Sequence, residues 1–154
     1  VWVEKFIEEN IHEVKEDLRV DTLYFCRALG HYWKNDLERS LVELSKVTSE
    51  EFVFKQNIKS LMLKIYYDLN ETEAFYSHID TYKHFILNNR LVHDKVREQV
   101  NNFINYSKKL FSIKNSDAAD KGYEINSMKN EISENQMLIN KIWLLKKTRE
   151  LTSR

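Results

Sequence analysis

Two amphipathic helices joined by a short polar turn are predicted between Lys55 and Leu87, and this stretch constrains the fold more than any other. Its first half carries one apolar stripe at helical spacing: Ile58, Leu61, Met62, Ile65 and Tyr66. Its second half carries another: Ala74, Phe75, Ile79, Tyr82, Phe85 and Ile86. Between them, Asn70 and Glu73 have the spacing of a capping box. Because short isolated helices are marginal in water, neighbouring helices must cover both stripes.

Composition favours an all-helical protein over one with strands. The 154 residues include no proline and two glycines, Gly30 and Gly122, so the chain has few of the turn signals that separate strands. The formal net charge is zero, which gives no overall field to attract nucleic acid or an anionic membrane. Charge is uneven, however, since residues 1–54 hold 7 basic and 12 acidic side chains, a net charge of −5.

Several functional classes have no sequence signature. A single cysteine, Cys26, excludes an internal disulfide framework and a multi-cysteine metal site. No apolar run is long enough for a membrane span, and no signal peptide is visible, so we expect a cytoplasmic location. The chain begins with Val1 inside an apolar helical pattern, which indicates a fragment of a longer protein that could carry any targeting segment.

Further helices are predicted on both sides of the central pair, at about 2–17, 22–34, 36–47, 91–113 and 123–151. Asp21 and Asp36 are the expected caps of 22–34 and 36–47, and a capping box formed by Thr48 and Glu51 is expected to open the central hairpin. The last helix has a heptad-like apolar spacing with Asn135 at one core position, a coiled-coil signal. We favour the alternative in which this long helix folds back antiparallel on 91–113.

The helical pattern repeats with a period of about 35 residues. Shifting the chain by that amount places Asn35 on Asn70, Tyr32 on Tyr67 and Leu44 on Ile79. The segment 28–47 resembles a tetratricopeptide repeat, with Ala28 and Ser40 at its small-residue positions and Leu44 at a large apolar position. The resemblance covers roughly residues 20–113.

This resemblance implies an all-α, right-handed stack of antiparallel helical hairpins, a tetratricopeptide-like α-solenoid with a long C-terminal helix. We expect a single domain over 1–154, with an N-terminal helix in 1–19 and hairpins in 20–47, 48–88 and 89–151. The implied function is a non-catalytic protein-interaction scaffold that captures a partner peptide or helix on its concave face. The repeat overlay predicts that this groove is lined by Phe25, Tyr32, Ser60, Lys64, Tyr67, Lys95, Gln99 and Asn102.

No catalytic residues, cofactor or metal site are predicted. Glu9 and His12 have the E-x-x-H spacing of a di-iron centre, but no second copy accompanies them, which indicates a surface pair. Asp80 and His84 are also read as a surface pair. The chain has no nucleophile elbow, glycine-rich phosphate loop or H-E-x-x-H motif, so we do not expect an enzyme.

Two alternative functions remain open. Eight tyrosines interleave with lysines, and the period is similar to that of pentatricopeptide RNA-binding repeats, so a single-stranded RNA or DNA binder is the first. The neutral net charge makes nucleic acid the less favoured partner. The second is a helical oligomerisation or accessory domain of a larger protein. Apolar residues at the N-terminus, with Trp2 the expected exposed member, predict self-association through residues 1–14.

Overall fold

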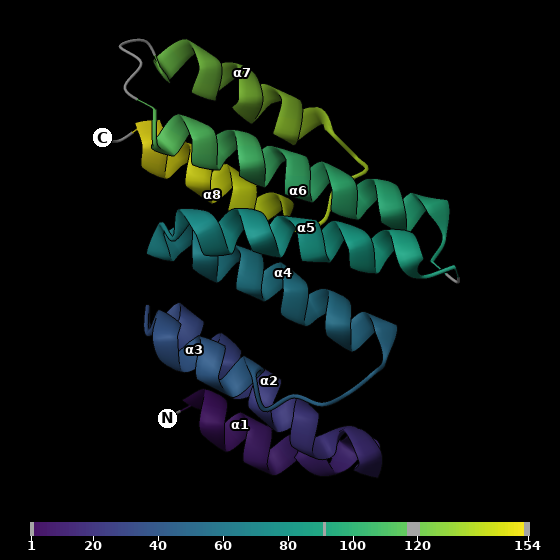
Figure 1. The fold of residues 1–154 in the computed structure, drawn as a ribbon. Helices are drawn as coiled ribbons and strands as arrows, with labels where there is room; N and C mark the ends of the chain where they lie inside the picture. Colours follow the sequence, from purple (N-terminus) through teal and green to yellow (C-terminus); the bar gives the residue numbers. More distant parts are fainter. Residues whose placement is uncertain (1, 91, 117–120, 153–154) are drawn as a thin grey trace. The chain divides into compact units, whose positions relative to one another are not determined.

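The computed structural model describes residues 2–90, 92–116 and 121–152, with side chains for all of these except 2–4 and 8 (Figure 1). The described residues contain helices and no strands, which confirms the all-α class. The α-helices are α1 (Trp2–Asn10), α2 (Arg19–Trp33), α3 (Leu37–Leu44), α4 (Phe52–Leu69), α5 (Thr72–Asn88), α6 (Asp94–Lys114), α7 (Lys121–Glu134) and α8 (Lys141–Thr152). Two 3₁₀ turns, η1 (Ile11–Glu13) and η2 (Glu16–Leu18), connect α1 to α2. The chain divides into two compact units, Val1–His78 and Ile79–Arg154.

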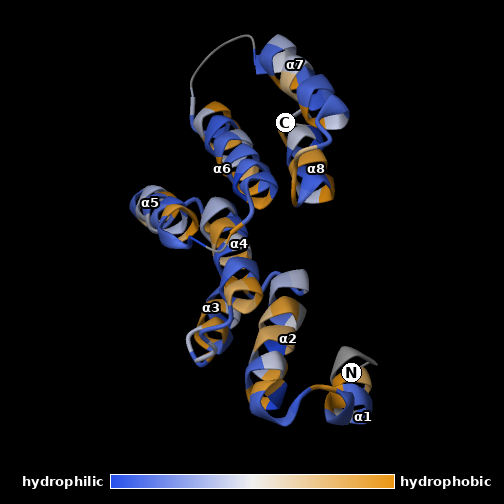
Figure 2. Cartoon of the chain, turned by 90° about the vertical axis from the view of Figure 1, so that its right-hand side faces the viewer, coloured by the Kyte–Doolittle hydropathy of each residue, from blue (hydrophilic) through white to orange (hydrophobic). Residues whose placement is uncertain are grey.

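In the first unit, α2 and α3 form a hairpin around two small residues. Ala28 is fully buried, and the Ser40 hydroxyl donates a hydrogen bond of 2.7 Å to the Ala28 carbonyl. These are the residues that the repeat pattern places between the two helices. Hydrophobic residues alternate with hydrophilic ones along α2 (Figure 2). Those on one face pack with α3 and α4 in a cluster that includes Leu37, Leu44, Leu61 and Ile65.

The predicted N-terminal helix over 2–17 is wrong, because α1 ends at Asn10 and the backbone at Val14 is extended. The break is stabilised by Arg19, whose guanidinium donates hydrogen bonds of 2.9 Å to the carbonyls of both Val14 and His12. A helix leaves carbonyls without partners where it stops, and an arginine that reaches back from the next helix satisfies two of them.

Two of the predicted caps, Asp21 and the Thr48–Glu51 box, are also wrong, and a third, Asp36, lacks the expected cap bond. Asp21 lies inside α2, which begins at Arg19, and its buried carboxylate accepts a hydrogen bond of 3.0 Å from the Thr48 amide. Thr48 is thereby tied to α2, while the residue before α4, Glu51, makes no side-chain cap bond. Asp36 does precede α3, but its carboxylate makes no cap bond either and lies 3.4 Å from His31 Nδ1.

The second unit contains α6, α7 and α8, each of which contacts the other two (Figure 1). The predicted long helix over 123–151 is wrong, since it ends at Glu134 and restarts at Lys141. Asn135, which carried the less favoured coiled-coil signal, accepts a hydrogen bond of 2.7 Å from the Met137 amide. Asn102 of α6 donates one of 2.8 Å to the Met137 carbonyl, and Asn140 adopts a left-handed φ of 54°. These asparagines allow α8 to fold back on α7.

Candidate interaction groove

The predicted concave groove requires its residues to face solvent, and two of them do not. Ser60 is 6 % exposed and Tyr67 is 2 % exposed, so neither can line a binding surface. The Tyr67 ring packs edge-on against Phe75 of α5, with 6.2 Å between the ring centroids. Burial at the contact between α4 and α5 therefore corrects the prediction for these two positions.

Three further residues of that set contribute to internal contacts of the first unit. Phe25 packs edge-on against Phe54 of α4, with 5.8 Å between ring centroids. The Tyr32 hydroxyl donates a hydrogen bond of 2.8 Å to the Asp68 carboxylate, which ties α2 to α4. Burial lowers the pKa of Lys64 to about 8, although the Asp68 carboxylate acts in the opposite direction. Lys64 is therefore a poor candidate for a solvated, peptide-binding cation.

The remaining three predicted residues belong to α6 in the second unit. Asn102 is committed to the Met137 carbonyl, as described above, and so helps to hold the turn between α7 and α8. Gln99 is half-buried and Lys95 is exposed. Hence Lys95 is the member of the α6 set that faces solvent most openly.

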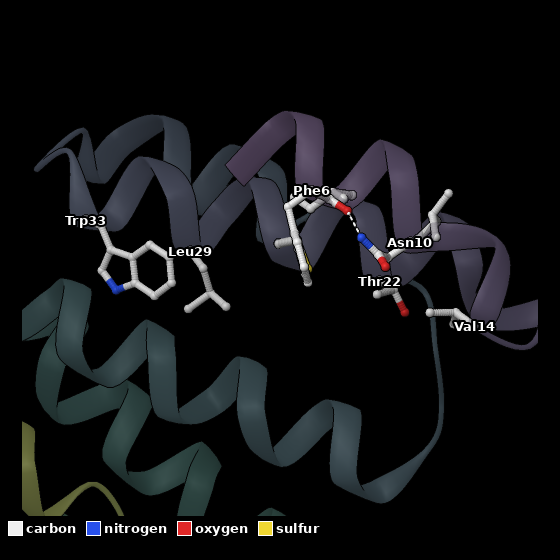
Figure 3. Close-up of a pocket in the computed structure, with 9 residues that line it drawn as sticks. Phe6, Asn10, Val14, Thr22, Leu29 and Trp33 are labelled. Atoms are coloured by element: carbon white, nitrogen blue, oxygen red, sulfur yellow. Dashed lines mark hydrogen bonds between the residues drawn. The ribbon is translucent and has the colours of Figure 1, made fainter. Parts of the chain in front are cut away.

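A different surface has the properties of a binding site. A groove of about 300 Å³ runs between α1 and α2, entirely within the first unit (Figure 3). It is lined by Phe6, Ile7, Asn10, Ile11, Val14, Thr22, Cys26, Leu29 and Trp33. Its walls are thus mainly apolar, with three polar or thiol-bearing side chains.

Two large aromatic residues of the groove are open to solvent. Phe6 is 52 % exposed and Trp33 is 68 % exposed, whereas Ile7 of α1 is buried against the neighbouring elements. Soluble proteins bury most large aromatic side chains, and exposed ones that lie on the same apolar surface mark interaction sites. The groove therefore combines an open entrance with aromatic side chains that a partner could cover.

The groove residues of α2 are not among those predicted from the sequence to bind a partner. A signal was present, because α2 carries apolar residues on two faces rather than one. Phe25, Ala28 and Tyr32 form one stripe, which meets α3 and α4. Cys26, Leu29 and Trp33 form a second, which faces the groove. A helix with two apolar stripes needs neighbours on both sides.

The polar or thiol-bearing side chains of the groove are those of Asn10, Thr22 and Cys26. Asn10 donates its side-chain amide to the Phe6 carbonyl at 2.7 Å. Burial raises the pKa of the Cys26 thiol, which reduces the fraction of reactive thiolate at neutral pH. Within residues 2–90, 92–116 and 121–152, no group of three or more His, Cys, Asp or Glu side chains is arranged to hold a metal ion.

Outside the groove, His78 is a buried titratable group with a strongly lowered pKa. It is 7 % exposed, and its Nε2 lies 2.8 Å from the Lys59 carbonyl. Since a carbonyl accepts only from a protonated nitrogen, this contact fixes the tautomer with hydrogen on Nε2. Burial is the main reason that the pKa of His78 falls to about 4, so the ring is neutral at pH 7. We interpret it as a structural contact between α5 and α4.

Comparisons with models of protein families, with curated proteins and with solved structures gave no match. The resemblance to tetratricopeptide repeats therefore remains a prediction from the residues themselves. Among the helices that the structure describes, none has the length and apolar character needed to cross a membrane.

Proposed function

We propose that this chain is a non-catalytic protein-interaction module and that the groove between α1 and α2 is its binding surface. The exposure of Phe6 and Trp33 on an apolar groove is the observation that carries the proposal. Removing apolar surface from water contributes roughly 25 cal/mol per Å², and aromatic residues are enriched among those that dominate binding energy. The proposed contact surface is thus on the first hairpin and α1, not in the concave set predicted from the repeat overlay.

A tetratricopeptide-like hairpin stack over about 20–113 is part of this proposal. Asn35 and Asn70 support it, since they follow α2 and α4, lie one repeat apart, and both have a left-handed φ of 59°. Asparagine is one of the few residues other than glycine that adopts this conformation readily. The close contact between Ala28 and Ser40 is a second supporting feature.

The test is a comparison of proteins retained by the immobilised chain and by two charge variants. Trp33→Asp places a carboxylate in the groove, and Tyr123→Asp places one at another exposed aromatic residue, 79 % exposed in the second unit. We expect proteins retained by the parent and by the Tyr123 variant to be lost from the Trp33 variant. Retention of the same set by all three would contradict the proposal.

A further inference from the structure

The groove between α1 and α2 has the shape of a site for a third helix. Its α2 wall is formed by Thr22, Cys26, Leu29 and Trp33, at successive spacings of four, three and four residues. This wall is about 16 Å long, given a rise of about 1.5 Å per residue. The two helices run antiparallel, with Asn10 beside Thr22 and Phe6 nearer to Leu29 (Figure 3). A third helix of about three turns would pack its side chains between those of the two walls.

The size of the groove limits how many side chains it can receive. An apolar cavity of about 150 Å³ is enough to bind a benzene molecule. The volume of about 300 Å³ therefore suits two large apolar side chains, such as leucine or phenylalanine. On a helix, two such anchors would be three, four or seven residues apart and would point to the same side.

Charge distinguishes one end of the groove. The segment that connects α1 to α2 contains the exposed carboxylates of Glu13, Glu16 and Asp17, against the exposed ammonium of Lys15. The nearby Arg19 guanidinium donates to backbone carbonyls and keeps its positive charge, so the three carboxylates and two cations of this segment leave a net charge of −1. Val14, which lines the groove, lies within this acidic segment. A ligand that reaches Val14 therefore meets an excess of negative charge, which attracts cations.

We propose that the groove binds an amphipathic helix of a partner protein, with two large apolar anchors on one face and Lys or Arg residues beside them. This inference rests on the proposed function and adds the chemistry of the partner. The carboxylates also argue against other occupants. In a symmetric pair of this chain, the same acidic segment would contribute to both sides, and nucleic-acid phosphates would be repelled by it.

The single cysteine provides a direct probe, because Cys26 lines the groove and the chain has no other thiol. We suggest measuring by mass spectrometry how fast N-ethylmaleimide alkylates the folded chain. The probes are synthetic helices of about 15 residues with leucine at spacings of four, three and four. One carries lysines on its polar face and a matched one carries glutamates. A bound helix covers the thiol and slows its alkylation.

We expect saturating lysine peptide to slow alkylation roughly tenfold or more, and the glutamate peptide to require about tenfold higher concentration for the same effect. Added salt should reduce the difference between the two peptides. Trp33→Glu should abolish the protection, and Tyr123→Glu, with its substitution in the other unit, should preserve it.

Four outcomes of the alkylation assay would contradict the proposed occupant of the groove. Equal protection by both peptides, or better protection by the glutamate peptide, would overturn the proposed partner chemistry while leaving an interaction groove in place. Absence of protection by either would reject a helix as the occupant. Protection that increases with the concentration of the chain itself, together with a dimer in sedimentation, would assign the groove to a second copy. Protection by a single-stranded oligonucleotide instead would assign it to nucleic acid.

Discussion

The two compact units each hold a phenylalanine and a tryptophan whose surroundings differ. In the second unit, Phe103 and Trp143 are 0 % and 9 % exposed, and their rings meet edge-on with centroids 5.9 Å apart. In the first unit, Phe6 and Trp33 are 52 % and 68 % exposed. Phe103 and Trp143 lie where α6 and α8 pack together with α7. Phe6 and Trp33 line a groove formed by two helices, α1 and α2. The number of helices around each aromatic pair thus accounts for a buried core in one unit and an exposed groove in the other.

The largest expected loss of stability is at the buried aromatic pair of the second unit. Phe103→Ala should lower the free energy of unfolding by about 3–5 kcal/mol, because it removes a fully buried ring and leaves a cavity. Urea unfolding followed by circular dichroism would measure it. Phe6→Ala is the matched change on the open side and should cost about 1 kcal/mol or less. Equal losses at the two positions would contradict the comparison.

The second prediction concerns how the stability of the chain depends on pH through the buried His78, which contacts the Lys59 carbonyl. Because the pKa of His78 is about 4 in the folded chain and about 6.5 when unfolded, the unfolded state binds the proton more tightly. Stability contributed by the neutral ring is complete above pH 6.5 and is lost progressively as pH falls towards 4. The loss should reach about 3 kcal/mol.

Urea unfolding at a series of pH values measures this loss. His78→Gln should flatten the dependence in that window, whereas His84→Gln, at an exposed position of the same helix, should leave it unchanged. A parent protein with constant stability from pH 7 to 4 would show that His78 is not buried in the neutral form.

A substitution at Gly30 should change the free energy of unfolding by less and tests how closely α2 is packed at this position. A methyl group added there would meet no heavy atom within 4 Å. Gly30→Ala should therefore raise stability by about 0.5–1 kcal/mol through the higher helix propensity of alanine. The midpoint of urea unfolding measures this gain. A loss of stability would indicate that this side of α2 is more crowded than the structure shows.

The smallest effect is expected at the open tryptophan. Trp33→Ala should change the free energy of unfolding by about 0.5 kcal/mol or less, because a side chain that is 68 % exposed loses little burial. The same substitution should weaken peptide binding in the alkylation assay strongly. If it destabilised the chain as much as Phe103→Ala, Trp33 would be a core residue and the groove would not be its main role.

The sequence predicted the helices whose signals are local. The turn at 69–71, for example, separates α4 from α5 as expected. The apolar stripes of the two helices and the polar residues of the turn are all encoded by neighbouring residues in the sequence. The errors have distant causes. The predicted helix over 123–151 is interrupted where Asn102, far away in the chain, supports the Met137 carbonyl. Likewise, Asp21 was predicted to cap a helix, but the structure pairs it with the Thr48 amide 27 residues later.

Two of the eight predicted groove residues are buried for a related reason. Helical spacing places Ser60 and Tyr67 on one face of α4, but it does not say whether another helix covers that face. The groove at α1 was missed because it depends on the break near Val14, which lets the chain reverse and lay α1 along α2. That reversal is supported by Arg19, a residue whose two hydrogen bonds no local pattern indicates.

Because α2 lies between the hydrophobic cluster and the groove, binding of a ligand in the groove should change the stability of this helix. Ala28 faces the hydrophobic cluster, and Leu29, the next residue, both packs against that cluster and lines the groove. A ligand that binds only the folded chain shifts the unfolding equilibrium by mass action, by about 2.7 kcal/mol at a free concentration 100 times its Kd. Amide hydrogens of α2 should then exchange with solvent more slowly when the groove is filled. The exchange rates of the α2 backbone amides would thus detect a bound partner without a chemical label on the protein.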